Sequence, residues 1–386
     1  MNNYSFPAPD ALAPTPRAGH KSALRTMLVV AAILVALLLG LLTLLLIGLG
    51  TGLVPLLIGF VLATLPVPIY VSLALWIDRF EPEPPWMLAT AFFWGALVAI
   101  FIAFVMNTIS GGIIALLAGD KAGEFFATVI SAPFVEETSK ALVLFGLFWW
   151  KRDEFDGVID GIVYAAMVGL GFAMTENIQY YGGAALEGGV AGSLGTFILR
   201  GLMAPFSHPL FTSMTGIGLG LASQTNKRGI RILAPLVGLF VAMSLHGLWN
   251  LSASLNPVLY FVVYFFIMVP VFIAVLVTIY YALQREGQIV REQLASDLQQ
   301  GFFTQQEYEC LCSVRGRMGA SWRAFRHGGV TMWRMRARYN STASELAFHR
   351  NRVARGLLAQ DEAAHAREEF YRRALYELST QMGRPQ

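Results

Sequence analysis

Two adjacent glutamates, Glu136 and Glu137, stand inside an apolar stretch, SAPFVEETSKALVLFGLFWW, that is long enough to cross a lipid bilayer. Lys140 follows Glu136 by four residues, so a helix would place both side chains on one side. A charged group in the hydrocarbon core costs about 2.5 kcal/mol or more, so such groups usually have a function. A carboxylate at this depth could activate a water molecule as a general base.

Three further apolar stretches carry polar side chains that could work with this pair. Glu176 lies in GFAMTENIQYY, His208 in APFSHPLF, and His246 comes four residues before Asn250 in HGLWN. Each residue alone could be a structural hydrogen-bonding group. Polar groups at membrane depth must face the interior of a bundle and satisfy one another. Because four consecutive apolar segments each contribute one or more of them, the sequence favours a shared site.

Carboxylates and imidazoles around a water molecule suit hydrolysis. His208 and His246 could ligate a divalent metal such as zinc together with Glu176, or they could donate hydrogen bonds to a developing oxyanion. The amide of Asn250 suits the oxyanion role as well. The HExxH motif of the common zinc proteases is absent from the sequence. The residues therefore leave metal-dependent and metal-free hydrolysis both open.

The composition predicts the elements that must position these groups. Of the 386 residues, 55% are hydrophobic and 14% are charged, whereas about 25% are charged in soluble domains. We therefore expect an all-α, polytopic membrane bundle of about eight transmembrane helices. The predicted spans are 27–49, 53–77, 87–108, 125–150, 157–181, 196–222, 231–253 and 258–283.

The distribution of Lys and Arg predicts the orientation of the bundle. Arg17, Lys21 and Arg25 precede the first span, whereas the connections on the opposite side hold only Lys121. Positive residues stay on the cytoplasmic side, so we expect a multi-pass protein of the plasma membrane with both termini in the cytoplasm. In this orientation the polar groups lie roughly 7–18 Å below the outer surface, at 1.5 Å per helical residue. A shared water-filled cavity that opens outward is the expected result.

We expect three regions along the chain: a disordered cytoplasmic N-terminal tail at 1–26, a transmembrane bundle at 27–283, and a cytoplasmic basic helical region at 284–386. The last region holds 16 of the 28 Lys and Arg residues. Basic residues beside a bilayer indicate proximity to anionic lipid, and no nucleic-acid-binding motif accompanies them. Cys310 and Cys312 fall in this region and are expected to be reduced thiols.

The motifs EETSK (136–140), FAMTEN (172–177), His208 and HGLWN (246–250) resemble the EExxK, FxxxEN and His motifs of the PrsW family of intramembrane proteases. The resemblance covers roughly residues 70–283. It implies an active site inside the membrane and hydrolysis of a peptide bond near the membrane segment of a substrate protein. The best-known role in that family is the first cut in a membrane-bound anti-sigma factor.

The resemblance also implies roles for the residues. Glu136 and Glu137 become the catalytic carboxylates, with Glu136 as the water-activating base and Lys140 helping to orient it. Asn250 becomes the oxyanion partner. Three residues become metal ligands or polarising groups: Glu176, His208 and His246. The related type II CAAX prenyl proteases have His where this chain has Glu176, so their chemistry cannot be transferred unchanged.

Two other functions compete with the protease. A proton- or ion-coupled transporter also uses embedded Glu, His and Lys, but it would more often show an internal repeat, and the sequence has none that we can identify. A non-enzymatic membrane scaffold would leave the polar groups of four spans unexplained. We therefore expect an intramembrane endopeptidase whose partners are a membrane-anchored protein substrate and the lipid bilayer, with no nucleic acid.

Overall fold

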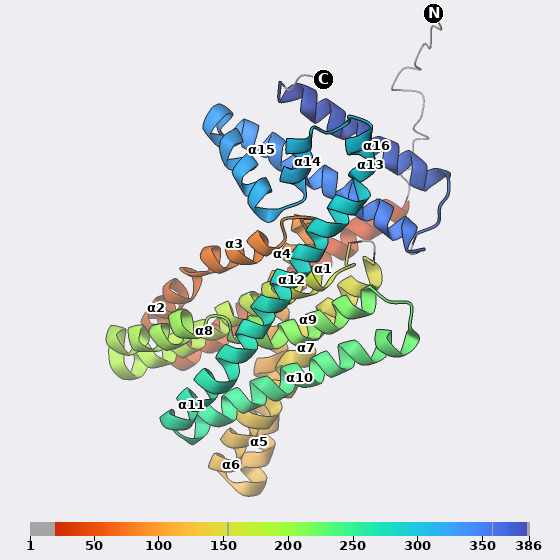
Figure 1. Ribbon diagram of the computed structural model, residues 1–386. Coiled ribbons are helices and arrows are strands. Elements are labelled where there is room, and N and C mark those ends of the chain that lie inside the picture. The colour runs from red at the N-terminus through yellow and green to blue at the C-terminus, as the bar shows by residue number, and fades with distance from the viewer. Residues whose placement is uncertain (1–19, 153, 357, 384–386) are drawn as a thin grey trace, which may run out of the picture.

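The structure is a computed structural model of the chain, and it describes residues 20–152, 154–356 and 358–383. Residues 1–19 of the predicted N-terminal tail lie outside the described residues, and the first helix begins at His20. The described part of the chain is helical and contains no strand (Figure 1). The predicted all-α bundle with a helical C-terminal extension is therefore confirmed.

Apolar helices dominate the bundle because a chain in lipid must satisfy its backbone hydrogen bonds internally. Six helical stretches are long and apolar enough to cross a membrane, which makes this a multi-pass membrane protein. They are Leu24–Thr51, Leu53–Ile77, Pro85–Ala118, Val158–Ser223, Arg228–Leu255 and Pro257–Gln293.

The structure has six apolar stretches where the sequence predicted eight spans, and the difference has two physical reasons. The stretch Val158–Ser223 includes the predicted spans 157–181 and 196–222, which the structure joins through a helical kink. The predicted span 125–150 is not among the six. It carries three charged residues within a few turns, which lowers its mean hydropathy: Glu136, Glu137 and Lys140.

The bundle is built from α-helices interrupted by short π-helical segments, which are written η. Its first half comprises α1 (His20–Thr51), α2 (Leu53–Thr64), α3 (Val67–Ile77), α4 (Pro85–Phe93), η2 (Trp94–Ala99), α5 (Ile100–Ala118), α6 (Asp120–Phe126), η3 (Ala127–Ser131) and α7 (Ala132–Trp150). Its second half comprises α8 (Val158–Phe197), η4 (Ile198–Met203), α9 (Ser207–Ser223), α10 (Arg228–Leu255), α11 (Pro257–Val263), η5 (Tyr264–Met268) and α12 (Val269–Gln293).

Helix α8 is the central element, and it is buried along most of its first half. It approaches α9 closely at Gly161 and Gly216, where a Cβ atom added to either glycine would lie 2.0 Å from the carbonyl oxygen of the other. Only glycine permits this backbone contact. Gly188 and Gly189 kink the same helix, and Gly189 has a φ of 61°. The chain therefore turns within the helix and returns toward α9.

Four C-terminal helices pack on one end of the bundle (Figure 1). They are α13 (Ala295–Gln299), α14 (Gln305–Leu311), α15 (Val314–Ala354) and α16 (Glu362–Gln381). Helix α12 runs through the predicted boundary at 283/284 and leads directly into them. Phe80, in the α3–α4 connection, is buried and lies 4.2 Å below the guanidinium of Arg317 from α15. This contact attaches the C-terminal helices to the bundle.

Candidate active site

Helix α7 carries the two glutamates and the lysine into the interior of the bundle. Pro133 lies in the first turn of this helix, where its missing N–H is not needed by the helix. Glu136, Glu137 and Lys140 are each at most 5% exposed. Trp94 of η2 supports this turn by donating a hydrogen bond of 2.8 Å to the carbonyl oxygen of Ser139.

Glu137 is fully engaged by its neighbours. Its Oε1 lies 2.9 Å from Lys140 Nζ and 3.0 Å from His246 Nδ1. Its Oε2 accepts a hydrogen bond of 2.9 Å from Thr212 Oγ1 on α9. Lys140 Nζ also stands 3.8 Å from the ring centroid of Phe172, in a cation–π contact. These bonds satisfy the carboxylate, so Glu137 fixes the positions of Lys140 and His246.

His208 connects this group to a second acidic residue. Its Nδ1 lies 2.9 Å from Lys140 Nζ, and its Nε2 lies 2.9 Å from Glu176 Oε2. Arg200 of η4 forms an ion pair with the same oxygen of Glu176, and its Nε donates a hydrogen bond of 2.8 Å to Asn177 Oδ1. A continuous series of contacts therefore runs from Arg200 to Glu137 and on to His246.

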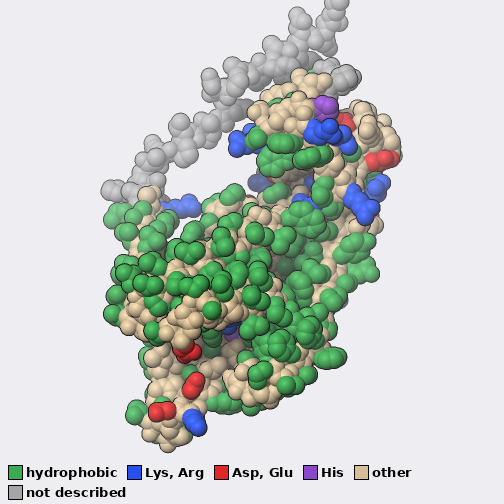
Figure 2. Space-filling view, turned by 90° about the vertical axis from the view of Figure 1, so that its left-hand side faces the viewer, with side chains coloured by type: hydrophobic (Ala, Val, Ile, Leu, Met, Phe, Trp, Pro, Cys, Tyr) green, Lys and Arg blue, Asp and Glu red, His purple; other side chains and the backbone are tan. Residues whose placement is uncertain are grey.

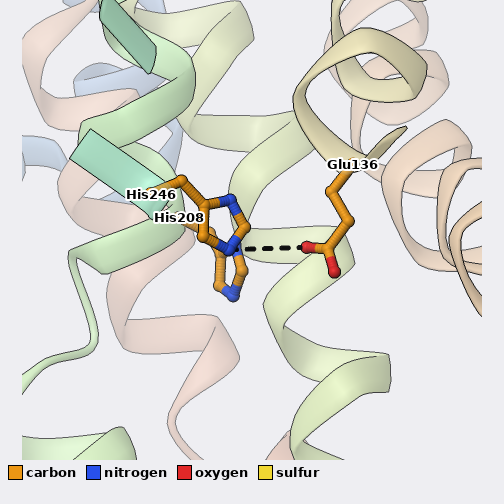
Figure 3. Close-up of side chains that lie close together, drawn as sticks. All are labelled: Glu136, His208 and His246. Carbon is orange, nitrogen blue, oxygen red and sulfur yellow. Dashed lines mark ion pairs between the residues drawn. The ribbon is translucent and has the colours of Figure 1, made fainter. Parts of the chain in front are cut away.

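Glu136 faces the two imidazoles from the other side (Figure 3). Its Oε2 lies 3.8 Å from His246 Nε2 and 3.6 Å from Lys140 Nζ, both beyond hydrogen-bond distance. This oxygen is buried and has no hydrogen-bond partner among the residues that the structure describes. Because an unsatisfied buried carboxylate oxygen is costly, it marks a place where a ligand, an ion or water would be bound.

Exposure of these side chains increases steadily toward Arg200. The exposed fraction is 0% for the Glu137 side chain, 7% for Glu136, 13% for Glu176 and 24% for Arg200. The Arg200 end is therefore the most exposed part of the site.

The depth of the site is similar on all four elements that build it. The connections after α7 and α9 contact the C-terminal helices, through Asp156 to Arg352 and through the Gln224 carbonyl to Arg355. Measured from the ends of their helices nearest the C-terminal helices, Glu136, Glu176, His208 and His246 lie roughly 21–27 Å along, at 1.5 Å per residue.

The donor set has the chemistry that a divalent metal requires. Ligand atoms of Glu136, His208 and His246 all lie within 4.8 Å of one another and are buried. Imidazole nitrogen and carboxylate oxygen are ordinary zinc ligands, and the contact between Glu137 and His246 Nδ1 orients that ring as outer-shell carboxylates do. Both ring nitrogens of His208 have partners, so this ligand would have to exchange one of them. With that exchange, the residues fit a metal.

The structure brings together six of the seven residues that the sequence singled out. Glu176, expected beside the histidines as a ligand, lies between Arg200 and His208, and Glu136 takes the place opposite both rings. Asn250 lies elsewhere, because its Nδ2 donates a hydrogen bond of 2.9 Å to the carbonyl oxygen of Thr128 in η3. It ties α10 to the segment that precedes α7.

Sequence reasoning missed two residues of the site, Arg200 and Thr212. Thr212 follows His208 by four residues, so helical spacing could have placed both on one face of α9. A charged residue inside an apolar stretch was the available signal for Arg200.

Comparison with known proteins places this arrangement in a family. A family profile described as PrsW family intramembrane metalloprotease matches residues 83–275. Protease PrsW of Geobacillus kaustophilus is 34% identical over 175 residues, which cover 45% of this chain and 69% of that protein. Protease PrsW of Bacillus subtilis is 30% identical over 190 residues, which cover 47% of this chain and 78% of that protein. No solved structure matches the chain.

The matched region holds every residue of the contact series and ends before the C-terminal helices. Buried acids and imidazoles that meet inside a multi-pass helical bundle are groups that can carry out hydrolysis within a membrane. With half of the chain matched by the family profile and two relatives covered over more than two thirds of their length, the chain belongs to the PrsW family of intramembrane proteases.

Proposed function

We propose that this protease hydrolyses a peptide bond of a membrane-anchored protein, with Glu136 as the base that activates water. The observation that carries the proposal is the buried Glu136 oxygen without a hydrogen-bond partner, which faces His246 at 3.8 Å. A water molecule between these two atoms could contact both at ordinary hydrogen-bond lengths. Its oxygen would bond to the carbonyl carbon while Glu136 takes its proton.

The neighbouring groups would hold this geometry and balance its charge. Glu137 keeps Lys140 and His246 in position, and the Lys140 ammonium offsets the negative charge that develops on the carbonyl oxygen. When the C–N bond breaks, the proton on Glu136 passes to the leaving nitrogen. Arg200 and Glu176 hold the ring of His208 at the entrance of the site.

A metal has a place in the same site. As an alternative to the step above, we propose zinc as the ion, held by Glu136, His208 and His246, because their nitrogen and oxygen donors are those that zinc accepts. Glu136 would then be a ligand and not the base. When bound, such an ion would polarise the substrate carbonyl and make a coordinated water more acidic.

We propose that the protein lies in the plasma membrane with both termini in the cytoplasm. The Lys and Arg bias of the connections supports this orientation, and so does the basic C-terminal region on one end of the bundle. The site would then lie in the outer half of the bilayer. The chain would divide into an N-terminal tail at 1–26, a protease bundle at 27–283 and a basic helical region at 284–386.

The substrate class to test first is a membrane-anchored anti-sigma factor that is cut near its membrane segment. Such a cut would be an instance of regulated proteolysis.

The test uses the full chain reconstituted in liposomes with a membrane-anchored substrate. We expect Glu136→Gln to lower the cleavage rate by about a thousandfold or more, because loss of a catalytic base removes a step that no other residue supplies. The abundance and melting temperature should change little, because the altered oxygen makes no hydrogen bond and Lys140 keeps its closer partner, Glu137, at 2.9 Å. Metal content is measured on the same samples.

The control is Glu124→Gln, which makes the same change at an exposed position of α6. It should cleave at the rate of the unaltered chain. Normal cleavage by Glu136→Gln would contradict the proposed role of this residue.

A further inference from the structure

A wide groove separates the bundle from the C-terminal helices and is independent of the proposed catalytic site. It has a volume of about 1430 Å³ and runs between α3 and α4 on one side and α15 on the other. Figure 2 shows this face of the molecule, where apolar side chains cover the bundle and Lys and Arg side chains gather on the C-terminal helices above a recess. Trp76 and Phe92 line one wall, and Trp322 and Phe325 line the other.

The lining of this groove includes polar groups that are unpaired among the described residues. Arg79 and Asn340 both line it, and Arg79 Nη1 and Asn340 Oδ1 are buried without a hydrogen-bond partner in the described part of the chain. The rest of the Arg79 guanidinium is held in place, because its Nε donates to the Trp76 carbonyl and its plane lies 3.8 Å from the Trp76 ring. A fixed cation with a free donor in the wall of an apolar groove is the pattern that binds an amphiphile with an anionic head.

Two acidic residues also line the groove, and neither pairs with Arg79. Glu83 accepts a hydrogen bond from Tyr164, and burial raises its pKa to about 11, so this carboxyl is neutral at pH 7. Asp78 accepts a bond of 2.6 Å from the Glu83 backbone N–H, and burial raises its pKa to about 7. The charge of Arg79 is therefore incompletely compensated.

The surrounding chain is strongly basic and aromatic. Residues 314–338 of α15 contain seven arginines and no acidic residue. Gly328 and Gly329 fold this helix back on itself, and the two arms expose Trp322 by 62% and Trp333 by 44%. Exposed tryptophan beside arginine is typical of segments that lie at the interface of an anionic membrane.

From these observations we propose that the groove is a binding site for an anionic phospholipid from the leaflet next to the C-terminal helices. The phosphate lies against Arg79, because an ionised phosphate diester can only accept hydrogen bonds and Asn340 Oδ1 is itself an acceptor. The acyl chains lie along the aromatic walls. Because α3 and α4 face lipid on their outer side, the groove opens directly into the acyl-chain region, and a lipid can enter without leaving the bilayer.

The experiment measures equilibrium binding of fluorescent phosphatidylglycerol and phosphatidylcholine to the full chain in neutral detergent. We expect the unaltered chain to bind phosphatidylglycerol at least about tenfold more tightly than phosphatidylcholine. Both lipids carry the phosphate, but only phosphatidylcholine also carries a choline cation, which Arg79 and the arginines of α15 repel. Arg79→Gln should reduce this preference, because it removes a cation that favours a lipid with net negative charge. It should weaken phosphatidylglycerol binding more than phosphatidylcholine binding. Trp322→Ala should weaken both lipids, because it removes part of the acyl-chain wall.

Two controls alter an arginine and an aromatic residue on the exposed surface of α16, away from the groove: Arg373→Gln and Phe370→Ala. Both should bind lipid as the unaltered chain does. Equal binding of the two lipids by the unaltered chain would overturn the proposal, and it is the result expected if the groove accepts a helix of a partner protein instead. A loss of preference in Arg373→Gln as large as in Arg79→Gln would also overturn it, because the attraction would then be a general surface effect. Since the first comparison needs no variant, the test stands even if Arg79→Gln fails to fold.

Discussion

At the scale of residues, the site divides two tasks between adjacent glutamates. Successive residues of a helix point about 100° apart, so Glu136 and Glu137 meet different neighbours. Glu137 accepts from three groups and is fully satisfied, whereas one oxygen of Glu136 has no hydrogen-bond partner among the described residues. Glu137 can therefore hold the side chains of the site in position while Glu136 remains free to react.

This division predicts a contrast in stability. Lys140→Met should destabilise the protein by on the order of 3 kcal/mol, because it leaves the buried Glu137 carboxylate without its ammonium partner at 2.9 Å. The melting temperature of the purified protein in detergent measures the effect. Lys121→Met, at an exposed position of α6, is the matched control and should have the same melting temperature as the unaltered chain. Equal melting of the two variants would show that the pair contributes nothing to the fold.

The sequence identified most polar residues of the site but not their pairing. Embedded charge is visible in any apolar stretch, which is why Glu136, Glu176, His208 and His246 could be selected. Which carboxylate faces both imidazoles depends on how each helix is rotated about its axis, and no local pattern records that rotation. Arg200 illustrates the limit, because its role follows from a contact with Glu176 on another element.

At the scale of elements, the apolar spans were predictable and their interruptions were not. Length and composition determine the spans, whereas η2, η3, η4 and η5 insert extra residues into single helical turns for reasons of packing. The connection expected at 182–195 is another example. The chain stays helical to this point and turns at Gly188 and Gly189, and a pair of glycines inside an apolar run did not distinguish a kink from a loop.

The kink in α8 predicts a strained substitution. Gly189 has φ 61° and ψ −154°, a conformation that is essentially restricted to glycine. Gly189→Ala should therefore lower the free energy of unfolding by about 1–3 kcal/mol, measured as a lower melting temperature. The control is Gly183→Ala in the same helix, where an added Cβ has open space and an ordinary backbone. It should be neutral or slightly stabilising. A neutral result for Gly189→Ala would mean that the turn can relax into another form.

At the scale of the whole molecule, the C-terminal helices are held by the connection between α3 and α4. Phe80 is buried under Arg317, and Arg352 forms an ion pair of 2.7 Å with Asp156 at the start of α8. The same connection continues into α4 and η2, where Trp94 bonds to the backbone of α7. One continuous segment of chain therefore contacts both the C-terminal helices and the turn that carries Glu136.

Buried acids in this connection predict how the assembly responds to pH. Burial raises the pKa of Asp78 to about 7, from an ordinary value of 3.8. Between these two values the folded protein holds a proton that the unfolded chain has lost, so this residue's contribution to stability is complete below about pH 4 and is lost as the pH rises through 7. The melting temperature should therefore be lower at pH 8 than at pH 5.5.

The variant Asp78→Asn stays neutral at every pH and should reduce this difference in melting temperature. Its side-chain oxygen can still accept a hydrogen bond from the Glu83 N–H, so the fold keeps that contact. Asp120→Asn, exposed on α6, should leave the difference unchanged. An unaltered chain that melts higher at pH 8 would reverse the sign and show that Asp78 is ionised and stabilised in the fold.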